Sequence, residues 1–172
     1  RDFRKSQLSL FIYRSYDYFS LPDINRYEYY NNGASVIVGH NYTNTLRGEF
    51  TVTGSQYGFS TTDSQQPSSA YRHAYRMGHY ETRADFRHLL NEKNTLEYGA
   101  EIIYYLLDRG TVSPFGEISQ RRTVELGTDR GIESALFITG SYGVTRRMKL
   151  NLGIRYMLFT PVGPAETFQY SS

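Results

Sequence analysis

Alternation of apolar and polar side chains is the feature that most constrains how this chain folds. In the segment Arg147–Leu158, apolar side chains occupy every second position: Met148, Leu150, Leu152, Ile154, Tyr156 and Leu158. Successive side chains of a β-strand point to opposite faces, whereas an apolar stripe on a helix repeats every 3.6 residues. The segment therefore predicts a strand with one apolar and one polar face.

The same alternation recurs along the chain and predicts seven long strands. Capped segments with helical periodicity are missing from the sequence. We therefore expect an all-β fold in one domain. The expected strands are residues 6–18, 34–42, 46–60, 74–89, 95–108, 130–144 and 147–159.

The connections between these strands alternate in length. The short ones fall at residues 43–45, 91–94 and 145–146, whereas the long, polar ones are Phe19–Gly33, Thr61–Arg72 and Arg109–Asp129. Outer-membrane barrels show this asymmetry because their periplasmic turns are tight and their extracellular loops are long. The predicted fold class is therefore an antiparallel transmembrane β-barrel segment.

Composition excludes several other classes. The 172 residues are 39% hydrophobic and 16% aromatic, which argues against disorder, and the net charge of +2 gives no reason to expect a nucleic-acid partner. There is no Cys, so disulfides and thiolate metal sites are excluded. The longest fully apolar run is Ile102–Leu107, far short of the roughly 20 residues that a membrane-spanning helix needs.

In a barrel, the two parities of each strand face the lumen and the lipid. We expect a polar, lumen-facing set: Arg83, Asp85, Arg87, Glu97, Glu101, Thr139, Lys149, Asn151 and Arg155. We expect a lipid-facing set of large side chains: Tyr80, Phe86, Tyr98, Ile102, Leu136, Ile138, Leu150, Leu152 and Ile154. Charged lumen residues in a filled barrel have to pair, so we interpret the charges as structural pairs that face a plug rather than as substrate contacts.

Side-chain chemistry predicts the register of the hairpin formed by residues 74–89 and 95–108. One register sets opposite charges and aromatic rings across from each other: Arg83–Glu101, Arg87–Glu97, Phe86–Tyr98 and Tyr80–Tyr104. A shift of two residues would instead set Asp85 against Glu101, a repulsive pair. For the last hairpin, closure at Gly143 and Arg147 predicts that the Phe137 ring covers Gly153.

Seven strands cannot close an antiparallel barrel, and open edges in lipid would leave backbone groups unsatisfied. Because the sequence also begins at Arg1 without a signal segment, we expect a part of a larger barrel. The alternative is a complete small barrel of eight strands with an adhesin or structural role, whose eighth strand would lie within Arg109–Asp129. A soluble β-barrel that binds a lipid fits the loop asymmetry least well.

The segment Ile132–Tyr170 resembles the mid-barrel of TonB-dependent outer-membrane receptors of the Bacteroidetes type. The resemblance is carried by Glu133–Ile138 on one strand, by Leu150–Tyr156 on the next and by the Gly163-Pro164 pair that follows. The Ser113-Pro114-Phe115-Gly116 loop and the Asn91–Thr95 turn are similar too. The resemblance implies about a third of a barrel of roughly 22 strands with a plugged lumen.

The resemblance also implies a function, location and partners. Receptors of this type sit in the bacterial outer membrane, among lipid and lipopolysaccharide, and import a scarce nutrient such as a siderophore, cobalamin or a glycan. The small nutrient ligand binds at the extracellular loops, and energised TonB pulls on the plug domain. We expect plug and TonB contacts to come from parts outside this segment.

Sharper readings of single residues are less well supported. His73, His79, His88 and Glu81 suggest a metal site, but ordinary polar side chains of a barrel wall explain them better, since ligation needs three or four convergent groups. Tyrosines cluster at residues 16–18, 27–30 and 103–105. An interfacial aromatic girdle or loop packing explains them better than a sugar-stacking surface. We find no catalytic constellation and expect neither an enzyme nor a cofactor.

Overall fold

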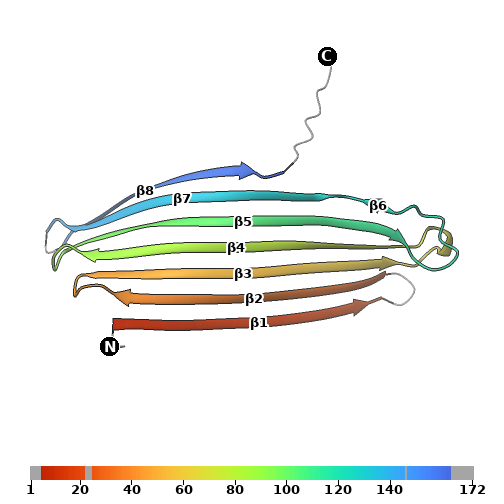
Figure 1. Ribbon diagram of the computed structural model, residues 1–172, viewed down its shortest axis with the longest axis horizontal. Helices are drawn as coiled ribbons and strands as arrows, with labels where there is room; N and C mark the ends of the chain where they lie inside the picture. The colour runs from red at the N-terminus through yellow and green to blue at the C-terminus, as the bar shows by residue number, and fades with distance from the viewer. Residues whose placement is uncertain (1–4, 22–24, 146, 164–172) are drawn as a thin grey trace, which may run out of the picture.

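The computed structural model describes residues 5–21, 25–145 and 147–163, and they form an all-β structure (Figure 1). The strands are β1 (Ser6–Ser20), β2 (Asn25–Asn41), β3 (Leu46–Asp63), β4 (Tyr71–Leu89), β5 (Asn94–Pro114), β6 (Val124–Glu125), β7 (Thr128–Gly143) and β8 (Lys149–Pro161). One short 3₁₀ helix, Pro67–Ser69, lies between β3 and β4. None of the described helices is long and apolar enough to span a bilayer.

The long strands form one antiparallel sheet in chain order, β1-β2-β3-β4-β5-β7-β8, with β6 attached to β5 (Figure 1). Each long strand pairs with its neighbour in the sequence, so every connection is a hairpin. Within the described residues the sheet is open, and β1 and β8 are its two edges. The expected all-β antiparallel fold is confirmed, as a sheet that is not closed into a barrel.

The predicted register of the β4–β5 hairpin is confirmed. Arg83 lies opposite Glu101, and Arg87 lies opposite Glu97. The aromatic partners also face each other, with ring centroids 5.4 Å apart for Phe86–Tyr98 and 6.2 Å apart for Tyr80–Tyr104. Cross-strand charge and ring pairing was therefore a reliable guide to register here.

The predicted register of the β7–β8 hairpin is wrong by two residues. Gly143 pairs with Lys149 rather than with Arg147, and Phe137 therefore lies opposite Arg155. The amide of Val144 donates to the carbonyl of Met148 at 3.0 Å. The hairpin therefore closes at Val144 and Met148, rather than at Gly143 and Arg147. An aromatic ring does cover a bare glycine, but the glycine is Gly99 of β5, which lies opposite Phe137.

The connections differ at the two ends of the sheet (Figure 1). At one end, here called the turn end, backbone hydrogen bonds close tight turns from Tyr42 to Leu46, from Leu90 to Asn94 and from Val144 to Met148. The other end, here called the loop end, carries the connections between β3 and β4 and between β5 and β7. It also carries the β1–β2 connection, and there the expected long loop Phe19–Gly33 is wrong, because β2 already begins at Asn25.

A β-bulge shifts the register of β4 and β5 near the loop end. Arg76 pairs with Asp108 and Ala74 with Thr111, so β5 has one extra residue at this point. Gly110 lies there with a φ of +74°, in the left-handed region that side chains other than hydrogen rarely adopt. A Cβ atom at Gly110 would collide with the carbonyl oxygen of Ala74. The extra residue therefore requires glycine.

The region Arg109–Asp129 would hold the eighth strand of a small barrel, but besides the ends of β5 and β7 its described residues form one short strand, β6. In it, β6 pairs at two positions, Glu125 with Thr111 and Val124 with Val112 of β5. The loop is held to the end of β5 by two backbone hydrogen bonds. The amide of Arg109 donates to the carbonyl of Gly127, and the amide of Leu126 donates to the carbonyl of Gly110. Such a strand cannot serve as an eighth wall strand of a small closed barrel.

Candidate functional site

The sheet has two chemically different faces, which we name after a central residue of each. All the polar residues predicted to face a lumen share the parity of Arg83, and all the large residues predicted to face lipid share the parity of Ile102. Successive side chains of a strand point to opposite faces. The structure therefore brings each predicted set together, on the Arg83 face and on the Ile102 face respectively.

The Ile102 face carries large apolar side chains that nothing covers in the described chain. Ile12 is 81% exposed, Ile154 is 76% exposed and Leu136 is 62% exposed. These side chains form rows that cross the whole sheet, for example Leu8, Val38, Phe50, Ala84, Ala100, Leu136 and Tyr156. A water-soluble surface rarely exposes so large a continuous apolar area.

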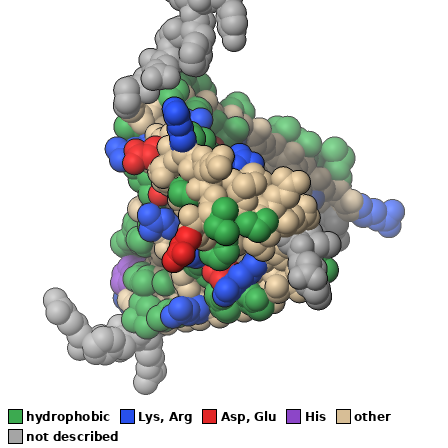
Figure 2. Space-filling model, turned by 90° about the vertical axis from the view of Figure 1, so that its right-hand side faces the viewer, with side chains coloured by type: hydrophobic (Ala, Val, Ile, Leu, Met, Phe, Trp, Pro, Cys, Tyr) green, Lys and Arg blue, Asp and Glu red, His purple; other side chains and the backbone are tan. Residues whose placement is uncertain are grey.

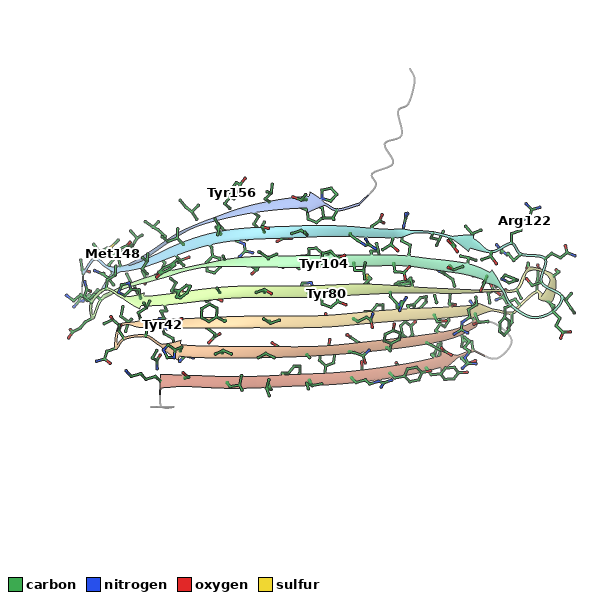
Figure 3. All side chains as sticks on the ribbon, viewed as in Figure 1. Tyr42, Tyr80, Tyr104, Arg122, Met148 and Tyr156 are labelled. Atoms are coloured by element: carbon green, nitrogen blue, oxygen red, sulfur yellow. The ribbon has the colours of Figure 1, made fainter. Side chains whose placement is uncertain are left out.

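This apolar band has clear limits along the strands. On β5 it runs from Leu96 to Tyr104, and on β4 from His88 to Tyr80. No Asp, Glu, Lys or Arg lies on this face between the row of Leu96 and the row of Tyr104, in any of the seven long strands as described. Figure 3 shows Tyr42 near the turn end and the Tyr80–Tyr104 pair close to the middle of the sheet, so aromatic rings border the band on both sides.

The Arg83 face is built around one enclosed carboxylate. Glu101 is only 7% exposed. Arg83 donates to its Oε2 at 3.3 Å, and Arg155 donates to its Oε1 at 2.6 Å. Arg155 comes from β8 and reaches Glu101 on β5 across Ala135 of β7, which is small enough to leave the space free. Both oxygens of the carboxylate are therefore satisfied, which a buried charge requires.

An aromatic ring and a second carboxylate complete this network. Arg83 donates twice to Asp85, at 2.7 and 2.8 Å. The guanidinium of Arg83 lies 5.1 Å from the centroid of the Phe137 ring, and that of Arg155 lies 5.7 Å from it. Cation–π contacts of this kind add to the ion pairs. We call Arg83, Asp85, Glu101, Phe137 and Arg155 the Glu101 network.

A groove of about 660 Å³ lies on the same face beside this network. Its charged lining comes from three neighbouring strands and includes Arg47, Glu49, Glu81, Asp85, Arg87 and Glu97. The pair Arg87–Glu97, at 3.4 Å, is exposed by 63% and 53% at the two side chains. The Arg87–Glu97 pair is therefore open to a polar partner, unlike the enclosed carboxylate of Glu101.

The histidines do not converge on a metal site. His79 lies 3.4 Å from Glu81 on the Arg83 face, whereas His73 hydrogen-bonds to the carbonyl of Arg109. His88 belongs to the opposite face, at the turn end. Within the described ranges there is no group of three or more His, Cys, Asp or Glu side chains that could hold a metal ion.

The tyrosine clusters are divided between the two faces, which the sequence did not reveal. Tyr27 and Tyr29 lie on the Arg83 face and contact Phe59, at 6.3 and 5.1 Å between centroids, and Phe59 in turn contacts Tyr75 at 5.0 Å. Tyr16, Tyr18 and Tyr30 have the parity of the Ile102 face. Phe59 and Tyr75 were not predicted as part of a cluster, because only the register of β2, β3 and β4 brings them together.

Comparisons with known proteins found no match for this chain: no family model, no curated protein and no solved structure is significantly similar to it.

Proposed function

We propose that this sheet forms part of the wall of a bacterial outer-membrane β-barrel, with its Ile102 face toward lipid and its Arg83 face toward the lumen. The observation that carries the proposal is the uncharged, exposed apolar band on one face only. In water such a face would need a second layer to cover it. Hydrocarbon tails supply that cover without any further protein.

The height of the band supports the same orientation. From Leu96 to Tyr104 on β5 it spans nine positions, and a tilted strand crosses the hydrocarbon core with about 9–11 residues. The aromatic side chains at its two limits correspond to the girdles that flank the lipid-facing band of outer-membrane barrels. The lumen side of such barrels is polar, as the Glu101 network and the neighbouring ion pairs are.

Strand direction indicates how the barrel closes. With seven long strands in antiparallel order, β1 and β8 run in the same direction and cannot pair with each other in that pattern. Antiparallel closure then takes an odd number of further strands between them. One further strand would complete a small eight-stranded barrel, and a larger odd number would complete a large one.

Within this class we favour a TonB-dependent receptor that imports a scarce nutrient, such as a siderophore, cobalamin or a glycan. The resemblance of Ile132–Tyr170 to such receptors supports the assignment, although its part from residue 164 on lies outside the described residues. In this proposal a plug domain docks against the charged groove of the Arg83 face, and TonB acts on that plug. The nutrient then binds at the loop end.

The first test is the size and behaviour of the source polypeptide. Outer membranes are extracted, and the protein is analysed by intact mass and by electrophoresis with and without boiling. A heat-modifiable species several times larger than 19.9 kDa supports a receptor. A heat-modifiable species near 19.9 kDa would contradict the receptor and leave a small barrel, and a protein absent from the membrane would contradict both.

The second test is which face meets lipid. The chain has no cysteine, so single cysteines can be placed at neighbouring positions of β7, Ile138→Cys and Thr139→Cys. A membrane-impermeant maleimide should react with Cys at 139 through the aqueous lumen and leave Cys at 138 unlabelled. Equal labelling at both positions would contradict the proposed orientation.

A further inference from the structure

The Ile102 face changes character between the apolar band and the loop end. Beyond the row of Tyr80 and Tyr104, strands β1–β5 carry four arginines on this face, Arg14, Arg26, Arg72 and Arg76, against two carboxylates, Glu28 and Asp108. The described part of this surface therefore has an excess of positive charge. Viewed from the loop end, charged side chains of both signs lie on the molecule's surface (Figure 2).

A groove of about 500 Å³ lies within this charged surface. Arg72 and Arg76 of β4 lie on either side of Ala74, and Tyr16 and Tyr30 also line the groove. Because Ala74 is small, the two longer side chains stand above it. The arrangement offers guanidinium and phenol donors to a ligand that sits on Ala74.

The arginines of this groove are anchored but keep free donors. Arg76 pairs with Asp108 at 3.2 Å, and Arg72 lies 3.8 Å from Glu28, whose other oxygen binds Arg26 at 2.7 Å. The side chains of Arg72 and Arg76 are 53% and 59% exposed. The Nε of Arg72 also donates to Ser60 Oγ at 3.2 Å. A guanidinium has five N–H donors, so these contacts still leave several of them available to an anion.

Directly toward the apolar band, the same face has a shallow apolar hollow of about 440 Å³. Ile12, Ala34, Gly54 and Tyr80 lie in one row across β1–β4 and line it. Its floor is low because Ala34 and Gly54 are small, and Tyr80 borders it with an aromatic ring. On β4 the row of the hollow at Tyr80 lies four residues from Arg76 and six from Ala74, roughly 13 and 20 Å at the rise of a β-strand.

We propose that the groove and the hollow together bind one phosphate-bearing lipid, with the phosphate at Arg72 and Arg76 and an acyl chain in the hollow. The inference rests on the proposed function, because it requires the Ile102 face to meet lipid. The apolar hollow favours a lipid over free phosphate, since a soluble anion has no use for it. The arginines favour a net anionic headgroup over a zwitterionic one.

The test uses the full-length protein in nanodiscs that contain equal amounts of phosphatidylglycerol and phosphatidylcholine. Native mass spectrometry after release counts each lipid that remains bound. The wild type should retain phosphatidylglycerol in preference, and the Arg72→Gln/Arg76→Gln variant should lose that preference by about tenfold, since it loses charge-assisted hydrogen bonds. Arg130→Gln, on the same face but outside the groove, is the matched control and should retain phosphatidylglycerol with the wild-type preference.

Two further arms separate a lipid from a free anion. Gly54→Leu fills the hollow and leaves both arginines in place, so it should reduce retained phosphatidylglycerol. Inorganic phosphate at millimolar concentration should not displace the lipid. Unchanged preference in the double arginine variant, unchanged retention in Gly54→Leu, or full displacement by phosphate would each overturn the inference. Failure of the proposed function is seen separately, in the maleimide labelling of Ile138→Cys and Thr139→Cys, which leave the groove and the hollow unchanged.

Discussion

The two faces of this sheet are made by the same strands, yet they are built for different surroundings. On the Arg83 face the central side chain is a carboxylate that is 7% exposed and held by two arginines. On the Ile102 face the next residue of the same strand, Ile102 itself, is 55% exposed. Two successive residues of β5 thus differ in an unusual way: the charged Glu101 is enclosed by other side chains, whereas the apolar Ile102 is exposed.

This enclosed charge and exposed isoleucine indicate which solvent each face requires. A charge is stable on the Arg83 face because partners and water can satisfy it, whereas an isolated charge on the Ile102 face would have no partner within the band. An exposed isoleucine is costly in water and costs nothing in hydrocarbon. The comparison therefore predicts that the two faces respond oppositely to the same substitution.

The strongest test of the comparison introduces one lysine on each face of β7. Leu136→Lys places a charge in the middle row of the apolar band and should lower the free energy of unfolding by about 2–4 kcal/mol in a bilayer. The measurement is urea unfolding in lipid vesicles, followed by far-ultraviolet circular dichroism because the chain has no Trp.

The matched control is Thr139→Lys, three residues further along β7 on the opposite face. Thr139 lies opposite Glu97 on the Arg83 face, so the new lysine gains a potential partner and the change should be within about 0.5 kcal/mol. Equal destabilisation by the two lysines would show that the faces do not differ in solvent.

The second test removes the enclosed carboxylate. Glu101→Gln keeps the shape of the side chain but leaves Arg83 and Arg155 without their shared partner. We expect a loss of about 1–3 kcal/mol, below the cost of breaking a fully buried pair because both arginines remain partly solvated. The same vesicle unfolding measurement applies. Arg83→Ala should cost less than Glu101→Gln, because Glu101 then still binds Arg155 at 2.6 Å.

The third test concerns the bulge rather than either face. Gly110→Ala introduces a Cβ atom that meets the carbonyl of Ala74, at a φ that alanine disfavours. We expect a loss of about 1–2 kcal/mol from the strained backbone. Gly116→Ala is the control, because Gly116 also has a positive φ but nothing lies within 4 Å of its Cβ position. A larger loss at residue 116 than at 110 would contradict the steric explanation.

The same comparison shows how far sequence alone could reach. Within the apolar band the faces alternate between apolar and polar residues, so both the strands and the Arg83–Glu101 register followed from the pattern. On β2 beyond the band, residues 25–33 are polar, aromatic or glycine on both faces, so the alternation disappears and the sequence predicts a loop where β2 runs. The length of the β7–β8 turn also could not be read from the sequence. Because of it, Phe137 lies opposite Arg155 and not, as predicted, opposite Gly153.

Two features of the candidate site depended on contacts that no local pattern encodes. Arg155 reaches Glu101 only because Ala135 of the intervening strand is small. The groove between Arg72 and Arg76 exists only because Ala74 lies between them on β4 and Tyr30 stands nearby on β2. In each case a single alanine leaves the space that the feature needs. The effect of that alanine can be recognised only when the register of the neighbouring strands is known.

The smallest expected effect separates the enclosed charges from the open ones on the Arg83 face. Arg87→Gln breaks an ion pair with Glu97 whose two side chains are 63% and 53% exposed. Exposed pairs of this kind contribute between nothing and about 0.5 kcal/mol, since water replaces the lost contact. Vesicle unfolding should therefore barely change, whereas removal of a plug that docks in the neighbouring groove should become easier if the proposal is right. A loss as large as that of Glu101→Gln would mean that Arg87 is enclosed in the complete barrel, and that the groove beside it is filled by the barrel's own residues.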